Sequence, residues 1–297
     1  MAEKLTIIVT CASRKTRPPV PWLRVRDLSG STLTARFDDW AGRLSRIQGP
    51  TTSLRALYQG EAWTAALRLE GLARAAGYAP EFLVASAGLG LRPVGAEAPS
   101  YASTFTPKHP DSCAANVEEA RAWWRALSSL PGSLPVTAID SPRMLLVLSK
   151  AYASAMHDDI VDLAQRQTET EILLFGGAKA VEGVHRIPAN LGLRPHFGGT
   201  ATSLNVRAAE AWLARDDGRE FWSPALEGRW TSWATRVSRS EIHDRTRIDD
   251  ATVIEMIREM RRRDPALSRT QTLREIRGSG FACEYTRFQA LFESVTV

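Results

Sequence analysis

Short apolar runs that end in small residues constrain the fold of this chain more than any other feature. Residues 6–10 read TIIVT, 82–86 FLVAS, 144–149 MLLVLS and 171–175 EILLF, and 194–197 is a shorter fifth candidate. Such runs are typical of strands that are buried on both faces of a parallel sheet. Each run is followed by a turn of small residues and then by a helical segment. This order predicts an α/β fold, a doubly wound sheet of four or five mainly parallel strands.

The segments between these runs predict the helices. They are expected over residues 33–46, 61–75, 116–128, 150–167 and 204–215. Gly77 ends the second of them, and Asn116 is a candidate cap for the third. Residues 1–215 are therefore expected to form one α/β domain.

The character of the chain changes after Asp216. Residues 216–248 are rich in Trp and Arg and form a predicted linker region. Residues 249–297 predict an appended all-α region: a helix that ends in three arginines, then two shorter helices separated by Gly278 and Gly280. This pattern is compatible with a helix-turn-helix unit that contacts DNA, and a plain helical packing module explains it equally well.

Composition limits the function classes. No apolar run approaches the roughly 20 residues of a membrane-spanning helix, and the first residues lack the apolar core of a signal peptide, so we expect a cytoplasmic protein with no membrane partner. Three widely spaced cysteines favour neither a disulfide framework nor a zinc site. A formal charge of +5, carried mostly by Arg, favours a polyanionic partner such as nucleic acid.

In a sheet of this kind a ligand binds where the loops leave the carboxyl ends of the strands. These loops are residues 11–19, 86–105, 149–152, 176–180 and 198–205. They contain many hydroxyls and the cations Lys15, Lys150 and Lys179, but few carboxylates: Glu97 lies within them and Glu61 in a neighbouring turn. An ordinary strand followed by a solvated basic loop is the alternative explanation of residues 6–15.

Several reactions lack their motifs. The sequence has no GxxxxGK[ST] loop for nucleoside triphosphates, and the glycines of GLGLRPVG do not have the dinucleotide spacing. No HxxxH or CxxC spacing indicates a metal, and no cofactor is implied. The turns FGGAK and GGTATS can direct backbone amides at phosphate oxygens, or their glycines serve only tight packing. Aromatic residues beside small-residue loops suit an enzyme that extrudes a base from DNA into a pocket.

Several motifs resemble a known group of proteins. The segments CASRK, LYQGEAW, SAGLGLRP and SYASTF resemble patterns of deazaguanine and archaeosine enzymes and of peroxide-stress proteins. FGGAKAVEG and GGTATSLN are similar to loops of uracil-DNA glycosylases, whose last-strand loop enters the DNA minor groove. Within this broad group the chain looks most like the bacterial antiphage DNA glycosylases that excise glucosylated hydroxymethylcytosine. The resemblance covers about residues 5–207, and it departs at one point: CASRKTRPP lacks the water-activating Asp of uracil-DNA glycosylases.

The resemblance implies an enzyme, a DNA glycosylase with a uracil-DNA glycosylase-like fold, that flips a modified base of double-stranded phage DNA and hydrolyses its N-glycosidic bond. Candidate catalytic residues are Glu61 and Glu97. The expected base and sugar pocket comprises Ser13, Lys15, Tyr58, Ser86, Gly88, Tyr101 and Thr104. The expected DNA-facing residues are Thr200, Ser203, Asn205, Arg207, Arg269 and Arg287. A base-exchanging transferase of the deazaguanine type and a non-catalytic DNA-binding protein remain the alternatives.

Overall fold

The computed structural model describes residues 2–47, 49–166, 169–177, 179–215, 220–239 and 245–295. Contacts between residues divide the chain into two compact units, Met1–Ser240 and Glu241–Val297, and each is described by itself. The predicted linker, residues 216–248, lies partly outside the described residues, at 216–219 and 240–244. Its central part forms helix α9, Pro224–Val237, which packs within the first unit.

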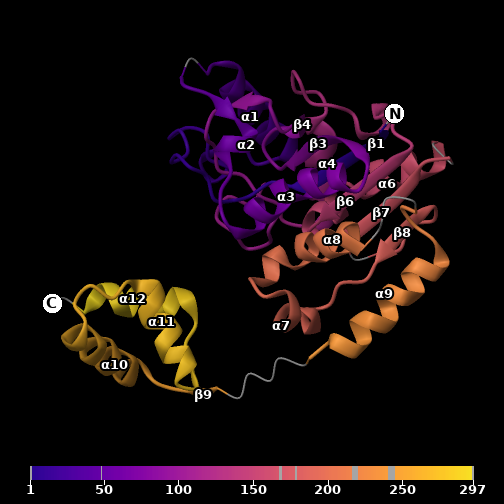
Figure 1. Cartoon of the computed structure of the whole chain (residues 1–297). Coiled ribbons are helices and arrows are strands. Elements are labelled where there is room, and N and C mark those ends of the chain that lie inside the picture. Colours follow the sequence, from indigo (N-terminus) through magenta and orange to yellow (C-terminus); the bar gives the residue numbers. More distant parts are fainter. Residues whose placement is uncertain are drawn as a thin grey trace. The chain divides into compact units, whose positions relative to one another are not determined.

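A six-stranded sheet organises the first unit, in the order β4-β3-β1-β6-β7-β8 (Figure 1). Neighbouring strands run parallel except β4, which is antiparallel to β3. The strands are β1 (Glu3–Thr10), β3 (Tyr78–Ser86), β4 (Gly90–Pro93), β6 (Arg143–Leu148), β7 (Glu171–Gly176) and β8 (Val184–Ile187). The predicted α/β class and the mainly parallel sheet are confirmed, and the four longest predicted strands are β1, β3, β6 and β7.

The prediction of a fifth strand at residues 194–197 is wrong. Residues 194–197 form a short helix, α7 (Arg194–Phe197), and the strand beside β7 is instead β8. Pro195 fixes a φ angle that suits the first turn of a helix, and Gly198 ends the helix with a φ of 70°. The sequence pattern missed β8 because only its last residue, Ile187, is buried.

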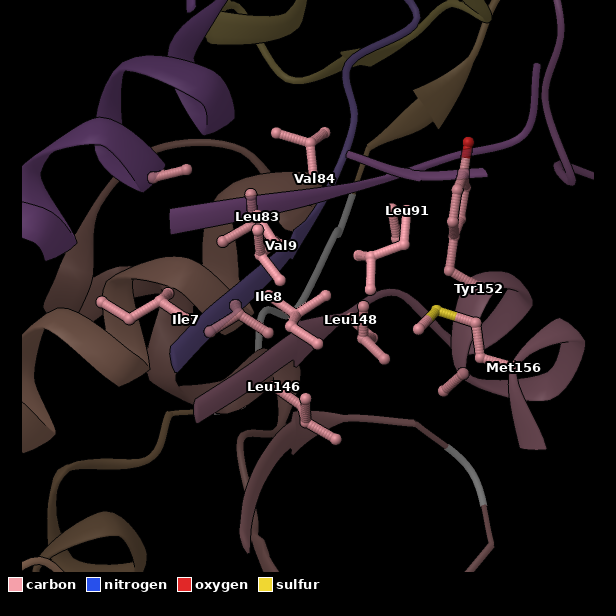
Figure 2. Close-up of a cluster of buried hydrophobic side chains, with 14 of the residues drawn as sticks. Ile7, Ile8, Val9, Leu83, Val84, Leu91, Leu146, Leu148, Tyr152 and Met156 are labelled. Atoms are coloured by element: carbon pink, nitrogen blue, oxygen red, sulfur yellow. The ribbon is translucent and has the colours of Figure 1, made fainter. Parts of the chain in front are cut away.

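Buried apolar side chains hold the centre of the sheet together. Every residue of β1 from Leu5 to Val9 is at most 1% exposed, as expected for a strand covered on both faces. Figure 2 shows Ile7, Ile8 and Val9 of β1 among side chains of β3, β4 and β6. Each such side chain contributes roughly 1.5–3 kcal/mol when it is fully buried. The carboxyl end of β1 is therefore fixed firmly in place.

Helices cover both faces of the sheet. Helices α3 and α8 pack on each other and against β3, β6 and β7, while α4 packs against α1 and α5. Along the sheet, the chain moves from β1 to β3 in one direction and from β6 to β7 in the other. Because such crossover connections are right-handed, the helices of the two crossovers lie on opposite faces of the sheet. The helices are α1 (Leu33–Ser45), α2 (Leu54–Leu57), α3 (Glu61–Ala75), α4 (Val117–Leu127), α5 (Lys150–Ala155), α6 (His157–Arg166) and α8 (Leu204–Arg215).

Most helix predictions hold, and one does not. Residues 150–167 do not form a single helix, because the chain breaks at Met156 between α5 and α6. Ser149 caps α5, and Asp158 and Asp159 lie in the first turn of α6, where a carboxylate is favourable. Smaller elements complete the unit: β2 (Thr52–Ser53), β5 (Glu97–Ala98), and 3-10 turns at Val25–Asp27, Val136–Ala138, Leu191–Leu193 and Ala201–Ser203.

The second unit contains three helices within the described residues, α10 (Asp250–Arg263), α11 (Arg269–Gly278) and α12 (Tyr285–Ser294). Two short parallel strands, β9 (Thr246–Arg247) and β10 (Phe281–Ala282), accompany them, so the region is not all-α as predicted. The strands escaped prediction because two-residue pairings carry no periodicity. Across both units, no helix in the described ranges has the length and apolar character that crossing a bilayer requires.

Candidate active site

The strand order places the loop after β1 where a ligand is expected. From β1 the chain first reaches β3 and β4 on one side, and later β6, β7 and β8 on the other. The direction of winding therefore reverses at β1. Open α/β sheets bind ligands outside the carboxyl ends of the strands at such a switch point.

The loop that leaves β1 pairs with the segment that precedes α3. Lys15 forms an antiparallel bridge with Tyr58, and the backbone amide of Gln59 donates a hydrogen bond to the carbonyl of Arg14 (3.1 Å). Helix α3 begins two residues later, at Glu61. The pairing therefore holds Lys15 and Glu61 on adjoining segments.

A buried hydrogen-bonded cluster lies beneath this loop. The hydroxyls of Tyr58 and Tyr101 are 2.5 Å apart, and the Tyr101 hydroxyl also bonds to the Ser86 hydroxyl. Ser86 Oγ in turn accepts hydrogen bonds from the backbone amides of Gly88 (3.1 Å) and Leu89 (3.0 Å). Burial raises the pKa of both tyrosines well above the ordinary value, so their hydroxyls stay uncharged.

Gly88 is required for the close packing around Tyr101. A Cβ atom at Gly88 would lie 2.6 Å from the Tyr101 ring and 3.0 Å from the Trp40 ring. Trp40 also donates a hydrogen bond from its indole nitrogen to the Gly88 carbonyl (2.8 Å). Tyr101 is only 1% exposed. Its ring therefore supports Lys15 from beneath the surface.

The side chain of Lys15 extends over the tyrosine cluster. Its Nζ lies 4.2 Å from the centre of the Tyr101 ring and 5.5 Å from that of Tyr58. Within the described part of the chain, Nζ makes a single hydrogen bond, a long one of 3.5 Å to the Ser13 carbonyl. Among the described residues, no carboxylate lies within ion-pair distance of Lys15. The ammonium is therefore held by aromatic rings and not by an acid.

The surroundings of Lys15 shift its pKa. Burial lowers the pKa of Lys15 below the ordinary 10.5, and the nearby Cys11 and Asp111 oppose that shift only in part. Cys11 itself lies 3.1 Å, Sγ to hydroxyl oxygen, from Tyr152 at the start of α5. The end of β1 and the start of α5 are thus joined by side chains at the switch point.

The carboxylate of Glu61 is held by α8 and by the loop that precedes it. Its Oε1 accepts hydrogen bonds from Arg207 Nη2 (2.8 Å), Ser203 Oγ (2.9 Å) and the Thr200 amide (3.3 Å). Gly199 permits this approach, since its φ is 79° and a Cβ there would lie 2.0 Å from the same oxygen. Burial raises the pKa of Glu61, but these hydrogen bonds outweigh it and leave the pKa below 4.5. The carboxylate is therefore ionised at neutral pH.

Asn205 lies at the same edge of the sheet. Its side-chain amide donates to the Leu148 carbonyl at the end of β6 (3.2 Å). Beside it, the Ser149 amide donates to the hydroxyl of Thr10 at the end of β1 (3.1 Å). These bonds align the carboxyl ends of β1 and β6 with the start of α8.

A basic pocket lies at the carboxyl ends of β6 and β7. Its volume is about 390 Å³, and α4, α5, α6 and the loop after β7 line it. Its charged or titratable lining residues are Glu118, Arg121, Lys150, His157 and Lys179. Arg121 pairs with Asp158 (3.4 Å), whereas Lys150 and Lys179 are exposed and have no ion-pair partner among the described residues. The pocket therefore offers free positive charge to an anion.

Some predicted site residues lie apart from this edge. Glu97 lies in β5 and lines a different pocket, of about 230 Å³, together with Arg92. The amide of Thr104 donates to the carbonyl of Asp111, and its buried hydroxyl donates to Thr106 (3.0 Å). The structure thus brings together Ser13, Lys15, Tyr58, Ser86, Gly88 and Tyr101, and separately Glu61 with Thr200, Ser203 and Arg207.

The two predicted DNA-binding arginines of the second unit have partners there. Arg269 pairs with Glu293 (2.9 Å), and Arg287 donates to Asp250 Oδ1 (2.6 Å) and to the Ile248 carbonyl (2.9 Å). Each therefore already stabilises contacts between elements of its own unit.

The sequence placed Tyr152, Lys150 and Lys179 in the loops where a ligand is expected without assigning them a role, and it gave Cys11 no role at the site. The available signal was position, because each follows the carboxyl end of a buried strand within a few residues. Among the described residues, no three His, Cys, Asp or Glu side chains cluster in a way that could hold a metal ion. Comparisons with family models, curated proteins and solved structures return no match to this chain.

Proposed function

We propose that this chain is a DNA glycosylase that hydrolyses the N-glycosidic bond of a modified base and leaves an abasic site. The observation that carries the proposal is the ionised carboxylate of Glu61, held by Thr200, Ser203 and Arg207 on a segment that adjoins Lys15. Hydrolysis of this bond develops positive charge on the sugar and negative charge on the departing base. A fixed carboxylate can stabilise the positive charge on the sugar, and a cation on the adjoining segment can stabilise the negative charge on the base.

Glu61 stabilises the oxocarbenium-like sugar and orients the attacking water. Its Oε1 is occupied by the loop and Arg207, and the side chain is 37% exposed, so the carboxylate remains within reach of solvent and substrate. Arg207 is a positioning residue, because it fixes the carboxylate through a bond of 2.8 Å and keeps its pKa low. General acid–base groups of this kind contribute roughly 100-fold to 10,000-fold to a rate.

Lys15 donates a proton to the departing base. Its ammonium lies over the buried tyrosines and lacks a carboxylate partner among the described residues, so it is available for a substrate atom. The lowered pKa of Lys15 makes it a stronger acid than an ordinary lysine. Ser13, exposed on the same loop, supplies a second hydrogen-bond donor.

The basic pocket binds phosphates of the DNA strand. Lys150 and Lys179 lie at the same edge of the sheet as Glu61 and have no ion-pair partner among the described residues. When lysines neutralise phosphates, counterions are released from the DNA, and this release increases the affinity of the protein for DNA. We propose Arg269 and Arg287 as weaker duplex contacts, since each is already paired within its unit.

The resemblance of CASRK, LYQGEAW and SAGLGLRP to antiphage DNA glycosylases suggests the base. We propose glucosylated hydroxymethylcytosine of phage DNA, so that excision protects a bacterial cell. The test uses duplex oligonucleotides that carry one cytosine, hydroxymethylcytosine or glucosylated hydroxymethylcytosine. Release of the glucosylated base, seen by mass spectrometry together with an alkali-labile site, supports the proposal; intact DNA in every case contradicts it.

The same experiment separates the two alternatives. A base-exchanging transferase releases the base only when a free replacement base is added. A non-catalytic DNA-binding protein binds the oligonucleotides and leaves them intact, and removal of residues 249–297 then abolishes binding.

A further inference from the structure

The environment of Lys15 differs from that of the other lysines. Lys4 pairs with Glu81 (3.1 Å), and Lys108, Lys150 and Lys179 are exposed. Lys15 alone among the lysines is partly buried, and in the described part of the chain no carboxylate lies within ion-pair distance of its Nζ. Lysines that attack carbonyl carbon are typically desolvated in this way, because an unpaired amine loses its proton more readily.

The side chain is also held in a defined direction. Nζ lies 4.2 Å from the centre of the Tyr101 ring, and the backbone of Lys15 is fixed by its bridge to Tyr58. Trp40 and Gly88 in turn pack closely against the Tyr101 ring. Burial lowers the pKa of Lys15, which agrees with the geometry. The amine is therefore both oriented and less costly to deprotonate than a surface lysine.

We infer that Lys15 is the amine nucleophile of an abasic-site lyase activity, which cleaves the DNA strand after the base has left. This inference rests on the proposed glycosylase function, because base excision supplies the abasic site. The ring-opened form of that site carries an aldehyde at C1′. Once Lys15 has given its proton to the departing base, its neutral amine can attack this aldehyde.

The chemistry balances without any further reagent. The Lys15 nitrogen forms a bond to C1′. The carbonyl oxygen takes up the two amine protons and leaves as water, so that an imine remains. The imine becomes cationic when it binds a proton. The cationic imine acidifies the C2′ proton, which passes to a water molecule. The C3′–O bond then breaks and the 3′ phosphate leaves. Water finally hydrolyses the imine and restores the Lys15 amine.

The experiment starts from a preformed abasic site, so that it does not depend on base excision. The full chain is incubated with a duplex that carries one abasic site, and borohydride reduces any imine to a stable covalent complex. We expect a trapped complex whose cross-linked peptide, identified by mass spectrometry, contains Lys15. A duplex with a tetrahydrofuran analogue, which has no aldehyde, should give no complex.

Two variants make the assignment specific. Lys15→Arg keeps the positive charge over Tyr101 but removes the nucleophile, and we expect loss of the trapped complex. Lys4→Arg, at the start of β1 and so at the opposite edge of the sheet from the loop of Lys15, should trap as well as the unaltered chain. Peptide mapping on the unaltered chain keeps the test valid even if Lys15→Arg folds poorly.

The outcomes distinguish this inference from the proposed function. No trapped complex with the unaltered chain, or a cross-link at another residue, overturns the lyase role of Lys15. Trapping on Lys15 together with an intact glucosylated oligonucleotide upholds that role and contradicts the proposed excision. Excision without trapping upholds the glycosylase and overturns the lyase.

Discussion

The two units of this chain use positive charge in different ways. In the C-terminal unit Arg263, Arg269 and Arg287 are paired within the unit, as in Arg263 with Glu275 (2.5 Å) and Arg269 with Glu293 (2.9 Å), while other arginines there, Arg258, Arg262 and Arg274, are exposed without an ion-pair partner among the described residues. At the edge of the α/β sheet, Lys15, Lys150 and Lys179 have no ion-pair partner among the described residues. A cation that is already paired gains less from a phosphate than a free one. Under the proposed function we therefore expect the unpaired lysines at the sheet edge to contact phosphates more strongly than the paired arginines do.

The two units also differ in how firmly they hold a side chain. The site of the α/β unit is attached to β1, whose residues Leu5 to Val9 are almost completely buried. The C-terminal unit has a small core in which Val253, Ile257, Ile276 and Phe288 are fully buried. Small units bury a smaller fraction of their surface and are less stable. Groups that must keep an accurate position are therefore better placed on the α/β sheet.

The largest effect is expected at Glu61. Glu61→Gln removes the negative charge while keeping the shape of the side chain, and we expect base excision to fall roughly 100-fold or more. Glu97→Gln is the matched change on the carboxylate that lies in β5, and it should leave excision nearly unchanged. Single-turnover release of the base measures both. A larger loss in Glu97→Gln would contradict the assignment of Glu61.

The pH dependence of excision should report the same carboxylate. The pKa of Glu61 lies below 4.5, so the active ionised form persists through neutral pH and is lost only as the pH falls through that lowered pKa. Arg207→Gln removes a hydrogen bond that lowers this pKa. The acid limb of the pH–rate profile should therefore move to higher pH in this variant. An unmoved limb would show that another group controls the rate.

A smaller effect is expected from the basic pocket. Replacing Lys150 and Lys179 together by Ala should weaken DNA binding on the order of tenfold and reduce the salt dependence by about one unit of log–log slope for each lysine. Lys108→Ala, an exposed lysine in another loop, is the control. Binding titrations at several salt concentrations measure the slopes. Equal slopes in all variants would contradict phosphate binding in this pocket.

The smallest effect on DNA binding is expected from the paired arginines of the C-terminal unit. Arg287→Ala breaks the bonds to Asp250 and to the Ile248 carbonyl, and should destabilise that unit by about 1 kcal/mol. The DNA affinity of the Arg287→Ala variant should fall less than the affinity of the variant in which Lys150 and Lys179 are both replaced. Thermal unfolding and binding titrations separate the two quantities. If Arg287→Ala lost as much DNA affinity as the double lysine variant, the expected difference between the two units in phosphate binding would be contradicted.

Local sequence patterns predicted much of the fold. The β-branched and apolar run before Cys11 predicted β1, and Asn116 caps α4 as expected, with its side chain accepting from the Glu119 amide (2.8 Å). These predictions succeed because capping and periodicity depend on neighbouring residues. The prediction of the fifth strand failed because residues 194–197, RPHF, contain only one large apolar side chain, while Pro195 and Gly198 favour a short helix that ends at Gly198.

The sequence by itself determined the α/β class, the order of the central strands along the chain and the loops at which a ligand is expected. It also offered both Glu61 and Glu97 as catalytic residues and could not choose between them. Only the tertiary structure pairs Glu61 with Arg207, 146 residues away, and leaves Lys15 over Tyr101 without a carboxylate partner among the described residues. Secondary structure follows from nearby residues, whereas ionisation depends on charges and burial that distant segments supply.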